Sequence, residues 1–242
     1  MELVEKESKP LKILWAINIL TEVDGQVYPS HLVQAFRIGR DTNYDFMLFT
    51  PRRMSIANAR NVAVEYALLN ECDYVYFTDD DMELNVNTLQ TLIKRDKDII
   101  MALCYIRGLP YSPMVFRWVD SEEARTKCAD IQVDGKLITL WEDCEKSVTE
   151  EGLIENVAAV GCAATLIKTS VFKQLQSPWF YTGTSNTEDV YFCMKAWSRI
   201  ADLSIAVDTT VPAGHVLKDK RILYPNNAAL LREHDKQLTA TN

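Results

Sequence analysis

The sequence predicts an α/β protein with a mixed, mainly parallel sheet that is flanked by helices and carries a small antiparallel excursion. Short runs rich in Val, Ile and aromatic residues alternate with stretches whose apolar residues recur at helical spacing. Such alternation is typical of strands joined by crossover helices, which makes neighbouring strands parallel. The 242 residues are 48% hydrophobic and 25% charged, with no internal repeat. We therefore expect one large domain with a sizeable core.

The first half of the chain contains four predicted strands and three predicted helices. Buried strands are expected at residues 11–20, 45–49, 74–78 and 98–104, and helices from residue 30 onward, at 56–70 and at 87–95. Ser55 is a good N-cap for the second of these helices. The apolar Leu32, Val33 and Phe36 mark the first helix.

The second half of the chain begins with a polar stretch, at about residues 119–152. Asp134-Gly135 is a good hairpin turn between residues 131–133 and 137–141, which predicts an antiparallel excursion. Strand-like sequence returns at 157–168, a helix is expected from 187 or 188 to 200, and a short strand at 203–207. We expect a tail at 1–10, one catalytic domain at 11–218, and an extension at 219–242 with a helix at 226–238.

Charge and cysteine usage argue against several classes of protein. The net charge is −8, which disfavours a broad nucleic-acid-binding face but leaves room for a local basic patch. No apolar run approaches the length of a membrane span, and the charged N-terminus lacks the apolar stretch of a signal peptide. The six cysteines form no CxxC pair, so neither a zinc cluster nor a disulfide framework is indicated. We therefore expect a cytoplasmic protein with reduced thiols.

Three consecutive acids, Asp79, Asp80 and Asp81, directly follow the predicted strand at 74–78. The carboxyl end of such a strand is where α/β sheets bind ligands. Three adjacent negative charges need compensation, and a divalent ion held by carboxylates and substrate phosphates would supply it. The alternative is that these acids cap the next helix or lie solvated in a turn. The chain contains neither GxxxxGK[ST] nor GxGxxG, which argues against a P-loop and a standard dinucleotide fold.

Other polar residues are candidates only in combination. His215 follows a Pro-Ala-Gly turn and suits Mn²⁺ beside a carboxylate, but alone is more often an ordinary loop histidine. Glu188 and Asp189 enter a helix, where acids complement the helix dipole or accept a proton from a hydroxyl. Arg60 lies on a helix of small residues and suits phosphate binding, although an exposed helical arginine is the simpler interpretation.

Taken in order, these segments resemble the GT-A glycosyltransferases, particularly the family 2-like enzymes. The likeness spans about residues 11–218 and rests on Ala59-Arg-Asn61, Tyr74-Val-Tyr-Phe-Thr-Asp-Asp-Asp-Met82, Val157-Ala-Ala-Val-Gly161, Pro178-Trp-Phe180, Glu188-Asp-Val-Tyr-Phe-Cys193 and Gly214-His215. The resemblance implies the GT-A nucleotide-diphospho-sugar transferase fold, which is Rossmann-like. It also implies transfer of a sugar, a hexose by expectation, from a UDP- or GDP-sugar to a hydroxyl acceptor.

The resemblance also assigns a role to each matching residue. The implied metal ligands for Mn²⁺ or Mg²⁺ are Asp81, Asp79 and His215, and the implied donor-binding residues are Arg60, Asn61, Asp79, Asp80 and Gly161. Asp79 and Asp81 would be the two acids of the DxD motif. Glu188 and Asp189 match the acceptor-side acidic pair, with Asp189 the better candidate for the base of an inverting reaction. A retaining reaction stays open, because retaining GT-A enzymes carry the same metal motif. Gly161 would leave room for the sugar or acceptor.

Several alternatives stay open at this point. The segment after the first strand departs from the common family 2 pattern, so Asn18 and Thr21 are only candidates for contacting the nucleobase. A sugar nucleotidyltransferase and a non-catalytic nucleotide-sugar-binding module are the competing functions. A glycan or lipid-linked glycan is the broadest expectation for the acceptor. Protein and modified nucleic-acid bases stay open as acceptors, although the acidic charge does not indicate a nucleic acid. Trp179, Phe180 and Tyr181 either stack on a sugar ring or pack.

Overall fold

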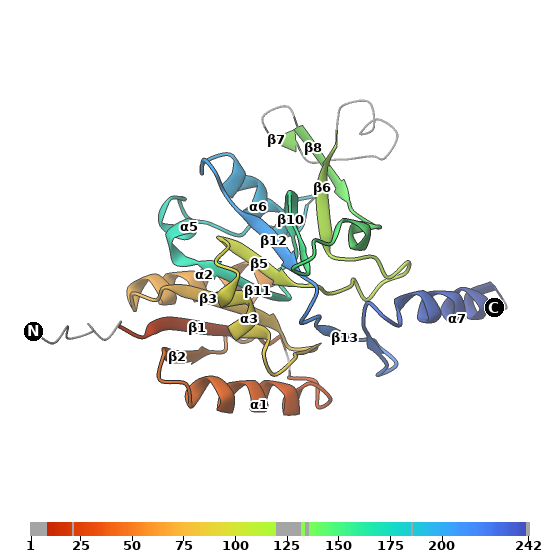
Figure 1. Cartoon of the computed structure of the whole chain (residues 1–242), viewed down its shortest axis with the longest axis horizontal. Coiled ribbons are helices and arrows are strands. Elements are labelled where there is room, and N and C mark those ends of the chain that lie inside the picture. Colours follow the sequence, from red (N-terminus) through yellow and green to blue (C-terminus); the bar gives the residue numbers. More distant parts are fainter. Residues whose placement is uncertain (1–8, 21, 120–131, 134–135, 185, 241–242) are drawn as a thin grey trace, which may run out of the picture.

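The computed structural model describes residues 9–20, 22–119, 132–133, 136–184 and 186–240, and its centre is a seven-stranded sheet (Figure 1). The strand order is β2-β1-β3-β11-β5-β12-β9. The bounds are β1 Leu11–Asn18, β2 Tyr44–Phe49, β3 Tyr74–Asp79, β5 Ile99–Ala102, β9 Leu153–Ile154, β11 Ala164–Lys168 and β12 Ile205–Asp208. Strands β11 and β9 run against the other five. The mixed, mainly parallel sheet is therefore confirmed.

Helices flank this sheet and confirm the predicted alternation. They are α1 Tyr28–Gly39, α2 Ile56–Leu69, α3 Thr88–Lys94, α5 Thr169–Lys173, α6 Glu188–Trp197 and α7 Ala228–Ala240, with a 3₁₀ turn at Cys144–Ser147. Helix α1 lies below β2 and β1 in Figure 1. Helix α7 extends from the right-hand side of the molecule, opposite the side on which the N-terminus lies. The C-terminal helix expected at 226–238 is thus present, displaced by two residues at each end.

The antiparallel excursion is a separate sheet of four strands in the order β10-β6-β8-β7. Its strands are β6 Val115–Val119, β7 Gln132–Val133, β8 Lys136–Leu140 and β10 Val157–Val160. The predicted turn Asp134-Gly135 lies outside the described residues, but β7 and β8 on its two sides do pair antiparallel. The strand-like sequence expected at 157–168 forms two strands, of which β10 joins this small sheet and β11 enters the central one.

A third small sheet has the order β14-β13-β4 and closes the edge at which the parallel strands end. Its strands are β4 Met82–Glu83, β13 Gly214–Val216 and β14 Ile222–Leu223. Strand β13 pairs with β4, so His215 lies opposite Met82. This pairing brings two segments that are far apart in the sequence to one end of β3.

The core is formed mainly by the central strands, whose apolar side chains are almost fully buried. Five cysteines, at 72, 104, 144, 162 and 193, are buried and free, and Cys128 lies outside the described residues. Within the part of the chain that the structure describes, no helix is long and apolar enough to cross a membrane.

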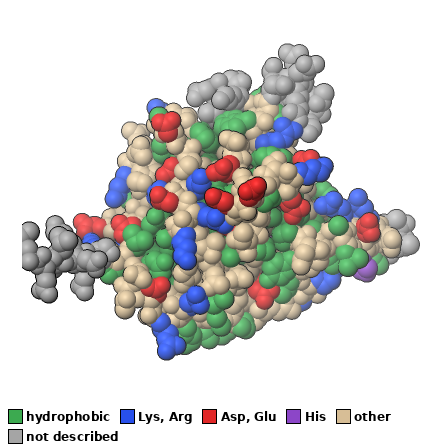
Figure 2. All heavy atoms as spheres, viewed as in Figure 1, with side chains coloured by type: hydrophobic (Ala, Val, Ile, Leu, Met, Phe, Trp, Pro, Cys, Tyr) green, Lys and Arg blue, Asp and Glu red, His purple; other side chains and the backbone are tan. Residues whose placement is uncertain are grey.

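Helix α1 inverts the expected arrangement of its side chains. Leu32, Val33 and Phe36 are 41%, 51% and 64% exposed, and green side chains lie along the lower edge of Figure 2, where α1 runs. The buried residues include His31 and Gln34, which bond the Met82 carbonyl at 2.9 Å and the Asn85 carbonyl at 2.9 Å. Hydrogen bonds to the chain after β3 therefore fix α1 where periodicity alone would point to apolar packing.

Candidate functional site

A cleft lies where β1 and β3 end. Asn18 and Asp79 are the last residues of these two parallel strands and pair in register. The cleft has a volume of about 400 Å³, and its described lining is Asn18, Ile19, Leu20, Met54, Ser55, Ile56, Ala59, Asp79, Asp80, Asp81, Arg107 and His215. Apolar side chains from the end of β1 and the start of α2 thus meet three consecutive acids. This is the edge of a parallel α/β sheet at which ligands bind.

Asp81 is bound by two cationic or ionisable side chains from distant parts of the chain. Arg107 Nη1 donates to Asp81 Oδ2 at 2.6 Å, and His215 Nε2 lies 3.3 Å from the same oxygen. These partners lower the pKa of the Asp81 carboxyl, although burial opposes the shift. Asp81 is therefore an ionised carboxylate at neutral pH, as a metal ligand must be.

His215 is oriented by a backbone carbonyl. Its Nδ1 lies 2.8 Å from the Tyr105 carbonyl oxygen, and because a carbonyl only accepts, Nδ1 carries the proton. Nε2 therefore faces Asp81. Burial lowers the pKa of the imidazole, but the Asp81 carboxylate outweighs burial and the net shift is upward. Metal-binding histidines are commonly oriented in this way, with one ring nitrogen, here Nδ1, bound to a carbonyl so that the other, here Nε2, can face a ligand.

The other two acids of the run face different partners. Asp79 accepts from Arg60 Nη2 at 3.1 Å, while Asp80 accepts from the Leu20 backbone N–H at 3.3 Å. Burial, together with the two neighbouring carboxylates, raises the pKa of Asp80 to about 6. The backbone carbonyl of Asp80 accepts from the Asp24 N–H at 2.9 Å. Asp80 therefore fixes the segment after β1 against the end of β3 and also lines the cleft.

The predicted metal ligands come together only in part. Asp81 and His215 are adjacent, whereas the Asp79 carboxylate is bound by Arg60. Among the described residues, no group of three or more His, Cys, Asp or Glu side chains is arranged to bind a metal. One carboxylate and one imidazole still fit an ion whose remaining ligands are phosphate oxygens and water. The residues present therefore suit a metal that binds together with a diphosphate.

Arg60 does not face the cleft as the sequence predicted. Its side chain is only 2% exposed and lies between Asp79 and Glu188, which it contacts through separate guanidinium nitrogens. Burial opposes the charge of Arg60, but the surrounding acids outweigh it and its pKa is raised. The expected direct contact with a nucleotide conflicts with this burial. Arg60 instead links the end of β3 to the first turn of α6.

Asn61, also expected to bind the donor, is committed to the protein backbone. Its Oδ1 accepts from the N–H groups of Trp179 and Phe180 at 2.9 and 3.0 Å, and its Nδ2 donates to the Phe180 carbonyl at 2.8 Å. These three bonds satisfy most of the capacity of the carboxamide. Trp179 and Phe180 are buried and therefore pack, whereas Tyr181 beside them is 55% exposed. Asn61 is thus a residue that positions this segment.

Glu188 and Asp189 begin α6 and differ in their partners. Glu188 is paired with Arg60, and burial raises the pKa of Glu188 while the Arg60 charge opposes that shift. Asp189 accepts from the Thr187 hydroxyl and from the Val190 N–H, the latter at 2.8 Å. Both acids are more than nine-tenths buried, at 6% and 7% exposure. They complement the N-terminus of α6, and among the described residues no cationic side chain donates a hydrogen bond to Asp189.

Gly161 faces a protein side chain. A Cβ at this position would overlap the terminal methyl of Met114, so a methionine side chain occupies the space that we had assigned to the sugar or acceptor. The Gly161 N–H donates to the Met114 carbonyl at 3.1 Å, and its own carbonyl accepts from Thr165 Oγ1 at 2.7 Å. The backbone of Gly161 is therefore bound to the protein on both sides.

The structure places Asn18, one of the two nucleobase candidates, in the cleft and adds Arg107 to the site. Asn18 is 7% exposed, and neither polar atom of its buried carboxamide forms a hydrogen bond of ordinary geometry with any residue that the structure describes. A buried unpaired amide is costly, which marks it as a group that a ligand would satisfy. Arg107 was missed because its loop shows no regular pattern, although it follows β5 and so lies at the same sheet edge. Thr21, the other nucleobase candidate, lies outside the described residues.

Several solved structures are similar to this chain at low sequence identity. The chain resembles A197 from STIV, with 18% identity, coverage of 88% of this chain and 94% of that one, and a TM-score of 0.54. UDP-glucose pyrophosphorylase complexed with UDP-glucose matches at 10% identity, with 83% and 91% coverage and a TM-score of 0.44. HddC from Yersinia pseudotuberculosis complexed with GMP-PN matches at 6% identity, with 84% and 92% coverage and a TM-score of 0.40.

The sequence itself matches a family model. No curated protein matches the chain in a sequence search. The Anp1 model, however, matches residues 25–175, which is more than half of the chain and contains the acidic run and β11. This model represents a GT-A-like mannosyltransferase family, so the nucleotide-diphospho-sugar transferase fold is supported but the family 2 resemblance is not. The chain belongs to the Anp1 family and is a nucleotide-sugar-using enzyme.

Proposed function

We propose that this protein is a metal-dependent glycosyltransferase that moves a hexosyl group from a nucleoside-diphosphate sugar to an acceptor hydroxyl. The proposal rests above all on one observation, the meeting of Asp81 and His215 in the cleft at the carboxyl end of β3. Mannose is the first sugar to test, because the Anp1 family is one of mannosyltransferases. UDP and GDP are the first nucleotides to test.

Asp81 and His215 would hold a divalent ion, Mn²⁺ or Mg²⁺, together with the diphosphate of the donor. Such an ion stabilises the negative charge that the diphosphate gains as the sugar leaves. The raised pKa of His215 means that its Nε2 must lose a proton before it can act as a ligand, so Mn²⁺-dependent binding would release protons. Asp80 and the orphaned Asn18 carboxamide line the same cleft and face the bound nucleotide in this proposal.

Asp189 is the proposed base, in preference to Glu188. Glu188 is held in a buried ion pair with Arg60, so its carboxylate is already occupied by a protein partner. Asp189 would accept the proton of the attacking hydroxyl, which would then form a bond to the anomeric carbon from the face opposite the diphosphate. That geometry inverts the configuration of the sugar. Removing a base of this kind typically slows a reaction by about 100-fold or more.

A glycan or another hydroxyl compound is the proposed acceptor. Tyr181 is 55% exposed and contacts Tyr191 edge to face, with ring centroids 5.6 Å apart. Tyr191 lies in α6 two residues after Asp189, and Tyr181 precedes this helix. An exposed tyrosine presents an apolar ring for a sugar and a hydroxyl for a hydrogen bond. This pair is the surface on which we expect the acceptor to bind.

The proposal is tested by ligand-induced stabilisation. Thermal unfolding is measured with UDP-glucose, GDP-glucose, UDP-mannose and GDP-mannose, each with and without MnCl₂. A donor at about 100 times its dissociation constant should raise the melting temperature by about 5–10 °C, and only when Mn²⁺ is present. Asp81→Ala should lose both this shift and sugar transfer. Metal-independent binding in the wild type, or transfer by Asp81→Ala at a near wild-type rate, would refute the metal assignment.

The reaction products separate the competing functions. A glycosyltransferase releases the nucleoside diphosphate, whereas a sugar nucleotidyltransferase releases pyrophosphate from a nucleoside triphosphate. Incubation with the stabilising nucleotide, followed by chromatography, distinguishes the two. Pyrophosphate release would replace the present proposal with the nucleotidyltransferase. Tight donor binding with neither hydrolysis nor transfer to any of a panel of acceptors would indicate a non-catalytic module.

A further inference from the structure

Arg107 is the one permanent cation among the described residues that line the cleft. Its side chain is 55% exposed and its guanidinium donates to Asp81 Oδ2 at 2.6 Å. The other charged lining residues are His215 and the three acids of the run. A diphosphate entering this cleft would therefore meet three carboxylates and needs a compensating positive charge. Arg107 is placed at the entrance to supply it.

The guanidinium of Arg107 has donors to spare. It carries five N–H groups, and arginine binds phosphate oxygens through two parallel hydrogen bonds. The exposure of Arg107 leaves it free to turn from Asp81 toward a ligand, unlike Arg60, which is 2% exposed. An exposed ion pair contributes little to stability, so exchanging Asp81 for a phosphate costs little. Arg107 therefore has the hydrogen-bond donors that a phosphate needs, and it can leave Asp81 at a small cost in free energy.

The loop that carries Arg107 is closed upon itself and tied to the site. The Ile106 N–H donates to the Ser112 carbonyl at 2.9 Å, and the Tyr111 N–H donates to the Gly108 carbonyl at 2.8 Å. At its start, the Tyr105 carbonyl binds His215 Nδ1 at 2.8 Å. The two ends of the loop are thus held together next to the cleft, and Arg107 directly follows Ile106 at the first of these ends.

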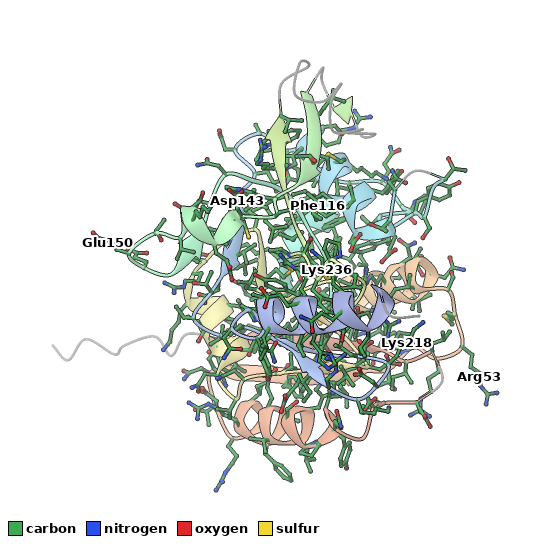
Figure 3. All side chains as sticks on the ribbon, turned by 90° about the vertical axis from the view of Figure 1, so that its right-hand side faces the viewer. Arg53, Phe116, Asp143, Glu150, Lys218 and Lys236 are labelled. Atoms are coloured by element: carbon green, nitrogen blue, oxygen red, sulfur yellow. The ribbon has the colours of Figure 1, made fainter. Side chains whose placement is uncertain are left out.

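The C-terminal helix holds the far side of this loop. The Tyr111 hydroxyl donates to Asp235 of α7, and Arg232 Nη2 donates to the Tyr111 carbonyl at 3.3 Å. Asp235 is in turn bound by Arg221 through two contacts of 2.8 and 2.9 Å. Figure 3 shows α7, which carries the labelled Lys236, lying across the molecule between α1 and the small antiparallel sheet. Helix α7 is therefore connected to the cleft through Tyr111 and the loop that carries Arg107.

We propose that Arg107 binds the diphosphate of the donor, and that α7 positions it by holding the loop at residues 105–112. The inference rests on the proposed function, since it takes the ligand of the cleft to be a nucleoside diphosphate. It assigns recognition of the distal phosphate to the protein itself, in addition to any bound ion. It also gives the C-terminal extension a role in donor binding.

The test compares ligands that differ by one phosphate. UDP, UMP, GDP and GMP are titrated into wild-type protein and into Arg107→Gln by calorimetry with MnCl₂ present. For whichever nucleotide the wild type prefers, Arg107→Gln should weaken the diphosphate by about 10- to 100-fold and change the monophosphate by less than about 3-fold. Arg107→Lys keeps a point charge but loses the planar guanidinium, so its affinity for the diphosphate should lie between those of the wild type and Arg107→Gln. Tyr111→Phe, which removes only the hydroxyl that binds α7, should show a smaller loss of the same selective kind.

The controls separate this inference from the proposed function. Arg40→Gln removes an exposed arginine that follows α1 and does not line the cleft, so it should leave all affinities unchanged. Unchanged diphosphate affinity in Arg107→Gln, with the wild type binding UDP or GDP, would overturn the inference alone. An equal loss for monophosphate and diphosphate would also overturn it, because it would indicate a general disturbance of Asp81. A wild type that binds none of the four nucleotides would overturn the inference and the proposed function together.

Discussion

Two clusters of charge lie at the end of β3 and differ chiefly in their access to water. The buried cluster consists of Arg60, Asp79 and Glu188, whose side chains are 2%, 23% and 8% exposed. The cleft cluster consists of Arg107, Asp81 and His215, with side chains 55%, 18% and 11% exposed. Each joins a cation to carboxylates, but only the cleft cluster has a solvent-accessible cation. The first is therefore expected to fix the structure, and the second to exchange partners with a ligand.

Breaking the buried cluster should have the largest effect. Arg60→Met leaves Asp79 and Glu188 without their cation in a low-dielectric environment, and we expect a loss of about 3–5 kcal/mol in the free energy of unfolding. Urea denaturation measures this loss. The double variant Arg60→Met with Glu188→Gln removes an uncompensated acid and should recover part of it. A loss below about 1 kcal/mol in the single variant would show that the cluster does not fix the fold.

The two acids that begin α6 provide the second test, because only Glu188 belongs to the buried cluster. Asp189→Asn should reduce the transfer rate by about 100-fold or more while the affinity for the donor changes little. Glu188→Gln, the matched control, keeps a hydrogen-bonding partner for Arg60 and should retain much more activity. Equal losses in the two variants, or a large loss of donor affinity in Asp189→Asn, would remove Asp189 from the role of base.

A third prediction concerns His31, which supports the backbone next to the cleft cluster. Burial lowers the pKa of His31 from its ordinary value of 6.5, although its bond to the Met82 carbonyl opposes the shift. The unfolded chain therefore binds the proton more tightly, and folding stability should fall as the pH drops below about 6.5, by at most about 1.4 kcal/mol per pH unit. His31→Gln keeps a donor for the carbonyl and should flatten the stability curve between about pH 5 and 6.5. An unchanged curve would contradict this assignment.

The smallest expected effect comes from neutralising the cleft cluster. Asp81→Asn should change the free energy of unfolding by no more than about 1 kcal/mol, because Arg107 is half exposed and can be solvated. The same substitution should abolish Mn²⁺-dependent donor binding. Measured beside Arg60→Met, it separates a charge needed for the fold from one needed for the ligand. A loss of several kcal/mol would place both clusters in the same class.

The elements of the sheet were predictable because they depend on local pattern. The runs that became β1, β3 and β5 are apolar on both faces, as strands covered by helices on both sides must be. The split of residues 157–168 was not predictable, because both halves are apolar and only their partners distinguish them. The exposed face of α1 was missed for a similar reason. Its inward residues are polar and satisfied by carbonyls from residues 82 and 85, which periodicity does not reveal.

Site residues were predictable where the sequence itself marks them, as in a run of acids or a rare histidine. They were not predictable where their roles depend on contacts between distant parts of the chain. The acidic run and His215 stand out by composition, and the structure does bring Asp81 and His215 together. Arg60 and Asn61 were predicted to bind the donor. In the structure, Arg60 pairs with Glu188 and Asn61 binds the backbone of the segment at Trp179. Those contacts span more than one hundred residues, and no local pattern records them. Arg107 was missed because it lies in a loop whose partner is 26 positions away.

Strand β11 has a consequence for how the chain must be assembled. It lies antiparallel between β3 and β5, yet it comes after the whole antiparallel excursion in sequence. Without β11, β3 and β5 have no strand between them and share no strand pairing. Strand β12, which joins β5 to β9, follows β11 in sequence, so β5 has neither of its neighbours until β11 has been made. A nascent chain that ends before Ala164 would thus expose one unpaired edge of β3 and both edges of β5, which are sites for pairing with other chains.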